Sequence, residues 1–180
     1  MINKNLSDIS EFKLPRYKDL PDFGIYLEQL VEIVNKTLEV MFEGDNKLTK
    51  TMVNNYVKDK LMPSPIKKRY YRDHIAYCIV ITVLKNILTM AEIDDGILFE
   101  LKKSSIEESY NYFCNKVEEV LRLVINILEK QDSPEIKGTA SINIDLDNRN
   151  GLTFAIVSVC TKVITQKLLG YELLKAKEDK

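Results

Sequence analysis

Hydrophobic residues recur at helical spacing along most of the chain. Between Asp22 and Phe42 the apolar side chains stand three or four positions apart, which places them on one face of a helix. The same spacing continues in further segments, over residues 49–59, 72–88, 89–103, 104–131 and 151–175. The pattern therefore predicts an all-α protein that ends in a pair of long helices.

Local signals mark where several of these helices start. Thr49 is a suitable N-cap, because its side-chain oxygen can accept a hydrogen bond from a free amide of the first turn. Thr89 with Glu92 fits a capping box. Ser104 or Ser105, each followed three positions later by a glutamate, can start the next helix in the same way.

Two segments between the helices carry weak strand signals. Residues 65–71 are short and β-tolerant after a proline-containing turn, and they could form a small two-stranded wing. In the polar connection over residues 132–150, Ile142, Ile144 and Leu146 alternate with polar residues, but no partner strand is evident. At most a small wing is therefore expected beside the helices.

The composition disfavours most metal and nucleophilic sites. The chain of 180 residues holds one histidine and three cysteines, Cys78, Cys114 and Cys160, and lacks a CxxC pair. Zinc sites and Ser-His or Cys-His catalytic sites need at least one histidine and usually more. No Gly-rich phosphate loop, HExxH motif or metal-spaced carboxylate set is present. We therefore expect no catalytic residue, metal or cofactor, and cysteines that are buried and reduced.

The sequence also indicates where in the cell the protein is located. The first 20 residues are polar and charged, without the pattern of a signal peptide. The most apolar runs, residues 75–84 and 154–164, are too short to span a bilayer. The expectation is a cytoplasmic protein without a membrane partner.

Positive charge is concentrated in one part of an otherwise acidic chain. The formal net charge is −1, but residues 47–72 contain eight basic side chains and a single acid, Asp59, which gives +7 for that segment. A localised basic patch attracts phosphates even when the total charge is near zero. The outer face of the helix over residues 49–59, which carries lysine, threonine and asparagine, lies within this segment.

The order of motifs here resembles the MerR-type winged helix-turn-helix. The motifs are Thr49, Asn54-Asn55-Tyr56, Leu61-Met62-Pro63, Arg69-Tyr70-Tyr71-Arg72-Asp73 and Leu88-Thr89-Met90-Ala91-Glu92-Ile93. More narrowly, the chain is similar to the YkrK-like family of small bacterial proteins, which contains a domain of unknown function. That resemblance rests on the runs Leu14-Pro15-Arg16-Tyr17, Leu48–Lys58, Lys67-Lys68-Arg69-Tyr70 and His74-Ile75-Ala76-Tyr77, and covers about residues 14–100.

The sequence pattern predicts an N-terminal arm over residues 1–20 and a C-terminal helical region over 104–180 that pairs subunits or senses a signal. The resemblance implies a winged helix-turn-helix between them, over 21–103. It places a recognition helix at about 49–59 in the major groove and a basic wing at 65–72 on the phosphates. Asparagine can pair with adenine, and lysine can reach guanine or phosphate. The residues expected to contact DNA are Thr49, Lys50, Thr51, Asn54, Asn55, Tyr56, Lys58, Lys67, Lys68, Arg69, Tyr70 and Arg72.

Two positions depart from the MerR pattern. Lys60 stands where that family has glycine, so the end of the helix cannot rely on the tolerance of glycine for left-handed backbone. Tyr71 stands where a serine N-cap is usual. Each candidate contact also has an ordinary structural explanation: Asn54 and Asn55 would suit a solvated helix face, and Tyr56 would suit the core.

Two functional hypotheses follow, from different classes. The first is a homodimeric, sequence-specific DNA-binding transcription regulator, whose partner is double-stranded DNA and whose small-molecule effector is unknown. The alternative is a helical protein–protein interaction module that does not bind DNA; an enzyme is disfavoured. The dimer contact is expected on the C-terminal helices, because residues 152–169 are too apolar for one helical partner to cover. Burial of that helix within one subunit is the other explanation.

Overall fold

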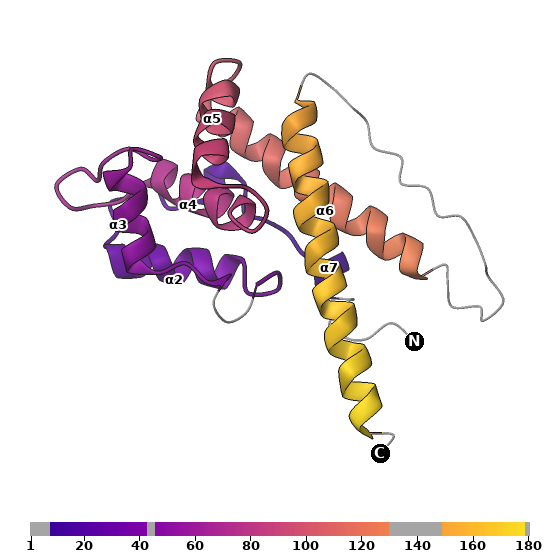
Figure 1. Cartoon of the computed structure of the whole chain (residues 1–180). Helices are drawn as coiled ribbons and strands as arrows, with labels where there is room; N and C mark the ends of the chain where they lie inside the picture. Colours follow the sequence, from indigo (N-terminus) through magenta and orange to yellow (C-terminus); the bar gives the residue numbers. More distant parts are fainter. Residues whose placement is uncertain (1–7, 43–45, 130–148, 179–180) are drawn as a thin grey trace. The chain divides into compact units, whose positions relative to one another are not determined.

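The computed structural model describes residues 8–42, 46–129 and 149–178, and within them the protein is helical, with no named strand (Figure 1). The elements are η1 (Tyr17–Asp19), α2 (Leu27–Thr37), α3 (Lys50–Lys58), α4 (Arg72–Leu84), α5 (Met90–Leu101), α6 (Ile106–Glu129) and α7 (Asn150–Glu178). The prediction of an all-α protein is confirmed. The weak strand signal at Ile142, Ile144 and Leu146 lies outside the described residues.

The chain forms two compact units. One is Leu14–Asn115, and the other combines Met1–Lys13 with Lys116–Lys180. This division differs from the one expected after residues 20 and 103, because α6 contributes to both units: its first residues belong to the larger unit and its remainder to the smaller one.

The larger unit is built around α4. Nine of the 13 residues of α4 are buried, as its uniformly apolar composition predicts, and α2 packs against both α4 and α3. The shared core contains Leu30 and Val34 of α2, Val53 and Tyr56 of α3, and Ile75 and Ile79 of α4. Because α3 has its apolar side in this core, its opposite side is held toward solvent.

The helix after Asp22 begins later than the periodicity predicts. Tyr26 is the N-cap of α2, and its amide donates to Oε1 of Gln29 at 2.9 Å. Ile25 cannot be helical because it pairs with Tyr70 in an antiparallel bridge, with both N–H···O distances at 2.9 Å. A partner some 45 positions away in the sequence therefore overrides the local helical pattern.

Two helices also end earlier than predicted, each where an asparagine binds backbone. Asn35 bonds both the amide and the carbonyl of Leu48, at 2.8 and 2.9 Å, and ties the segment before α3 to α2. The Asn86 amide donates to the carbonyls of Thr82 and Val83, at 2.9 and 3.1 Å, and so satisfies carbonyls at the end of α4. The Asn86 side chain thus takes the place of a helical bond that a longer α4 would make.

The predicted caps are present. The Thr49 hydroxyl accepts from the Met52 amide at 3.2 Å, and Thr89 and Glu92 form the reciprocal capping box of α5. Of the two candidate serines, Ser105 starts α6, because the Glu108 amide donates to its hydroxyl at 3.2 Å. These starts depend only on neighbouring residues, so the sequence alone predicts them.

The arm from Leu14 to Pro21 is fixed to the larger unit at several points. The amide of Tyr17 donates to Oδ1 of Asn111 at 2.9 Å, and its hydroxyl donates to Asp73. Burial, followed by the bond to Asp73, raises the pKa of Tyr17 to about 12, so this phenol keeps its proton. Leu14 and Leu20 are buried beside it.

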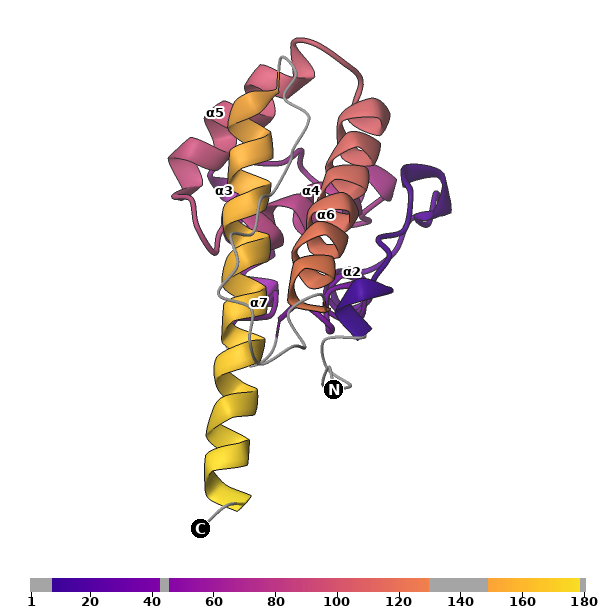
Figure 2. The ribbon, with the colours of Figure 1, turned by 90° about the vertical axis from the view of Figure 1, so that its right-hand side faces the viewer.

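In the smaller unit, α7 packs against the later part of α6, and the two helices run in the same direction (Figure 2). Cys160 lies beside the backbone of Val117, with Sγ 3.9 Å from the carbonyl oxygen. The buried face of α7 consists of Thr153, Ile156, Val159, Cys160, Val163 and Ile164. Part of the apolar surface that suggested a dimer contact is thus covered from within the chain, whereas Phe154 and Leu169 remain exposed.

The apolar stretch of α7 is longer than the sequence pattern indicates. Asn150–Gly170, 21 residues with a mean hydropathy of 1.4, is long and apolar enough to cross a membrane, and 33% of this stretch is buried in the structure. The expectation that every apolar run is too short is corrected here. It treated Lys162 as an end point, whereas the helix continues past this single exposed charge.

Candidate nucleic-acid interface

The candidate interface begins with the outer side of α3. Val53 and Tyr56 anchor the inner side, each at most 5% exposed. The side chains that face solvent are Thr49, Lys50, Thr51, Asn54, Asn55 and Lys58. Because these polar residues lie on one rigid, capped helix, they keep fixed positions relative to each other.

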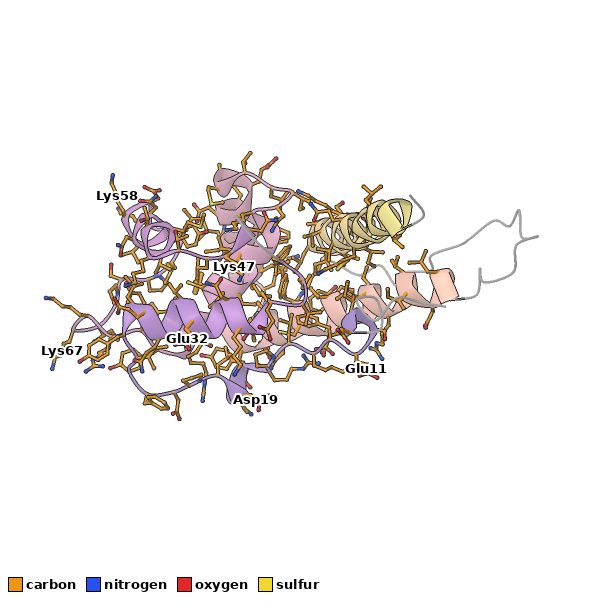
Figure 3. All side chains as sticks on the ribbon, turned by 90° about the horizontal axis from the view of Figure 1, so that it is seen from below. Glu11, Asp19, Glu32, Lys47, Lys58 and Lys67 are labelled. Atoms are coloured by element: carbon orange, nitrogen blue, oxygen red, sulfur yellow. The ribbon has the colours of Figure 1, made fainter. Side chains whose placement is uncertain are left out.

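A two-residue turn, Ile66–Arg69, lies next in the basic segment. Ile66 and Arg69 exchange two backbone hydrogen bonds, at 2.9 and 3.0 Å, and Lys67 and Lys68 form the exposed tip. Both lysines have positive φ, 48° and 63°, which is the pattern of a type I′ turn. Figure 3 shows Lys58 of α3 and Lys67 of this turn pointing outward at the same edge of the larger unit.

The turn does not extend into the two-stranded wing that the sequence suggested. Beyond the Ile66/Arg69 pair, residues 65 and 70 would face each other without backbone hydrogen bonds, and Tyr70 turns its backbone groups to Ile25 instead. The next rung is occupied by His74: Nδ1 accepts from the Tyr71 amide at 3.0 Å, and Nε2 lies 3.3 Å from the Ser64 carbonyl. The wing is replaced by isolated bridges and a histidine that joins the two chain segments.

In the part of the chain that the structure describes, left-handed backbone is found at lysines. Among the described non-glycine residues, positive φ occurs at Lys60, Lys67 and Lys68, and nowhere else. At Lys60, φ is 60°, and the Leu61 amide bonds the Tyr56 carbonyl at 2.9 Å, which closes α3 in a Schellman motif. Glycine is the residue that adopts this backbone without strain, so the chain accepts strain at three exposed positive charges.

Part of the basic segment is engaged within the protein. Lys50 pairs with Glu28 of α2, with an N–O distance of 2.7 Å. The Arg69 guanidinium stacks on the Tyr26 ring, 3.4 Å from its centroid. Arg72 donates to the Leu20 carbonyl at 3.0 Å and therefore holds the arm. These residues were expected on DNA, but their charges have partners in the free protein.

Two tyrosines of the expected set belong to the core. Tyr56 and Tyr70 are each 5% exposed, and burial raises the pKa of both; for Tyr56 it reaches about 12. Their rings support α3 and the Ile25 bridge from inside. The exposed candidate surface therefore reduces to Thr49, Thr51, Asn54, Asn55, Lys58, Lys67 and Lys68.

Comparison with known families matches residues 15–113 to a domain of unknown function, DUF1836. The match spans more than half of the 180 residues. The chain belongs to the DUF1836 family. No curated protein and no solved structure shows significant similarity to it. The DUF1836 match nearly coincides with the compact unit Leu14–Asn115, so the α3 surface and the lysine turn lie inside the family domain.

Sequence reasoning missed three residues that shape this surface of the DUF1836 domain. Tyr26 holds Arg69, and His74 joins Ser64 to Tyr71. Gly24 makes room for the turn, because a Cβ there would lie 2.9 Å from Cβ of Arg69. Gly24, which precedes α2, and His74, the third residue of α4, are unusual enough in the sequence to draw notice. Their roles could not be predicted, because the residues that they contact are distant in the sequence.

The strained lysines give a direct prediction for stability. Replacing Lys60 or Lys68 by glycine should raise the free energy of unfolding by about 1 kcal/mol each, because glycine adopts the left-handed backbone without a Cβ clash. Urea unfolding, with an unchanged m-value, measures this gain. As a control, Lys58→Gly lies in helical backbone and should lower stability by about 1 kcal/mol. A loss of stability in all three variants would show that the left-handed positions carry no strain.

Proposed function

We propose that this protein is a cytoplasmic, sequence-specific DNA-binding regulator of transcription that performs no chemistry on its target. In this proposal the outer side of α3 enters the major groove of double-stranded DNA. Lys58, Lys67 and Lys68 bind phosphates beside it. The arrangement is that of a helix-turn-helix in which a short basic turn takes the place of a wing.

The observation that carries the proposal is the placement of lysine at left-handed backbone positions. Strained backbone persists where the surrounding structure enforces it, and it gathers at functional sites. A simple structural role at Lys60, Lys67 and Lys68 would be filled better by glycine or asparagine. Retaining lysine at an energetic cost supports a function for the charges, and phosphate is the common anion that such a cluster attracts.

The dimensions of α3 agree with this use. Its nine residues give a length of about 14 Å, and a helix with side chains is about 10–12 Å across, close to the ~12 Å width of the major groove. The exposed side chains of the proposed surface are the hydroxyls of Thr49 and Thr51 at the start of α3, the amides of Asn54 and Asn55 in its second half, and Lys58 at its end. Short polar groups can reach base edges, whereas the flexible lysines reach the backbone.

Asn54 is the residue proposed to read sequence. Its side chain is exposed on α3, and an asparagine amide can bond N6 and N7 of adenine together. Asn54→Ala should cost about 1–3 kcal/mol on the preferred site and little on random DNA. Competition binding with both DNAs measures this ratio.

A matched control is Asn115→Ala, which removes an exposed asparagine from a helix of the same unit but outside the proposed surface. It should change neither affinity. If Asn54→Ala leaves the ratio of specific to random binding unchanged while the fold is intact, another residue reads the sequence.

The alternative remains a helical interaction module. It is favoured by the internal pairing of Lys50, Arg69 and Arg72, which removes part of the basic charge, and by the exposed Leu98 and Phe99 of α5. The two functions separate by salt dependence: DNA binding through phosphates weakens steeply as salt rises, whereas contact through apolar side chains does not.

A further inference from the structure

The exposed side of α5 contains a stripe with the spacing of a helix–helix contact. Glu92, Gly96 and Phe99 follow at intervals of four and three residues, which places them on one line along α5, and Lys103 follows four positions later, just past the end of the helix at Leu101. Phe99 is 54% exposed, although it is among the largest apolar side chains of the unit. Gly96 beside it leaves open space: a Cβ there would have no atom within 4 Å.

The charges of α5 and of the two lysines after it determine whether two copies would pair parallel or antiparallel. Acidic residues, Glu92, Asp94 and Asp95, occupy the first half of α5, whereas Lys102 and Lys103 stand at its end. Two copies side by side in the same direction would place like charges together. In the opposite direction the acidic half of one copy meets the lysines of the other.

We infer that α5 pairs with α5 of a second copy of this chain, antiparallel and with two-fold symmetry. One alignment of the two antiparallel helices gives both the apolar residues and the charged residues a complementary partner. When Phe99 of one copy lies over Gly96 of the other, Glu92 of the first lies opposite Lys103 of the second. The interface is therefore self-complementary, as a two-fold contact must be.

Within one subunit the same residues are already arranged for this contact. The Lys103 ammonium lies 3.7 Å from the centroid of the Phe99 ring, so the positive charge borders the apolar surface that the partner would cover. Glu92 is fixed by the capping box, in which its carboxylate accepts from the Thr89 amide at 2.8 Å. Bonds from Thr89 lower the pKa of Glu92 and keep it charged.

The size of α5 limits the strength of the pair. Its 12 residues span about 18 Å, which is too short to bury the ~800 Å² per partner of a standard stable interface. The expected species is a weak dimer that forms as the concentration rises. This contact differs from the one expected on α7, where Phe154 and Leu169 are also exposed.

Sedimentation velocity of the full chain over a concentration series tests the inference. The wild-type protein should pass from monomer to dimer, and Gly96→Arg should raise the dissociation constant by roughly tenfold or more, because the new side chain occupies the space for Phe99. Gly151→Arg is the matched control: it adds the same side chain at another open helical glycine, in α7, and should leave the dimer unchanged.

Circular dichroism and thermal unfolding of the same variants complete the experiment. Gly96→Arg should melt as the wild-type monomer does. A wild-type chain that stays monomeric throughout, or a dimer that Gly96→Arg does not weaken, would overturn the inference. A lower melting temperature for Gly96→Arg without any change in association would show that the stripe is covered by another part of the same chain, and would overturn it equally.

Discussion

Replacing Lys58, Lys67 and Lys68 together by alanine is expected to weaken binding to every DNA duplex by on the order of a hundredfold. Each lysine is exposed and belongs to α3 or the adjacent turn. If each phosphate contact contributes about 1 kcal/mol, the three together contribute about 3 kcal/mol. Each contact also releases counterions, so the slope of log K against log salt should become shallower by about 0.9 per contact, or about 2.7 in all.

Fluorescence anisotropy with specific and random duplexes over a salt series measures both quantities. The control is a triple alanine variant at Lys18, Lys36 and Lys47. It removes the same charge from exposed positions outside the proposed contacts. The triple control should lower affinity only slightly. An unaltered salt slope in the Lys58, Lys67 and Lys68 variant would mean that these lysines are ordinary surface charge, and the interaction module would become the better explanation.

His74→Ala should lower the free energy of unfolding by about 2–4 kcal/mol, the largest effect of a single substitution that we predict. The ring is buried and joins two segments of backbone, bonding the Tyr71 amide and the Ser64 carbonyl. Because Nδ1 accepts the Tyr71 proton, Nε2 carries the hydrogen that reaches Ser64. Alanine would leave both backbone groups unpaired and open a cavity beside Tyr70.

The matched variant is His74→Gln. A glutamine at the third helical position can accept from the N-cap amide through its oxygen and can donate through its nitrogen, so it should retain a large part of the stability. Chemical denaturation of both variants measures the difference. Equal losses for alanine and glutamine would show that His74 acts by packing its ring against Tyr70 and not by bridging the two segments.

The parts of the fold that the sequence predicts are those set by neighbouring residues. Thr49, Thr89 and Ser105 start helices where expected, since a cap and its partner amide are three positions apart. The central place of α4 also follows from its composition, because a helix that is apolar on all sides must be covered.

Distant partners explain what the sequence does not predict. Ile25 belongs to a helical pattern by spacing, yet its bridge to Tyr70 delays the start of α2. The wing fails for a related reason, because His74 bonds the Tyr71 amide and the Ser64 carbonyl, which a second strand would need to pair with each other. Nothing local in the sequence indicates that these segments meet.

In the candidate site, too, the sequence predicts the features set by neighbouring residues and not those set by distant partners. The exposure of Asn54, Asn55 and Lys58 follows from helical periodicity around Val53 and Tyr56. The engagement of Lys50, Arg69 and Arg72 does not, because each pairs with a residue from the segment 20–28. Charge counted along a sequence therefore overstates the charge that is free to meet a phosphate.

Selection of bound sequences from a random duplex library tests the central claim most directly, with the wild-type chain and Asn54→Ala taken through the same rounds. The wild-type protein should enrich a defined motif that includes adenine, and Asn54→Ala should enrich a motif in which that preference is relaxed. A wild-type selection that ends with no enrichment over the starting library would contradict the claim that α3 reads DNA.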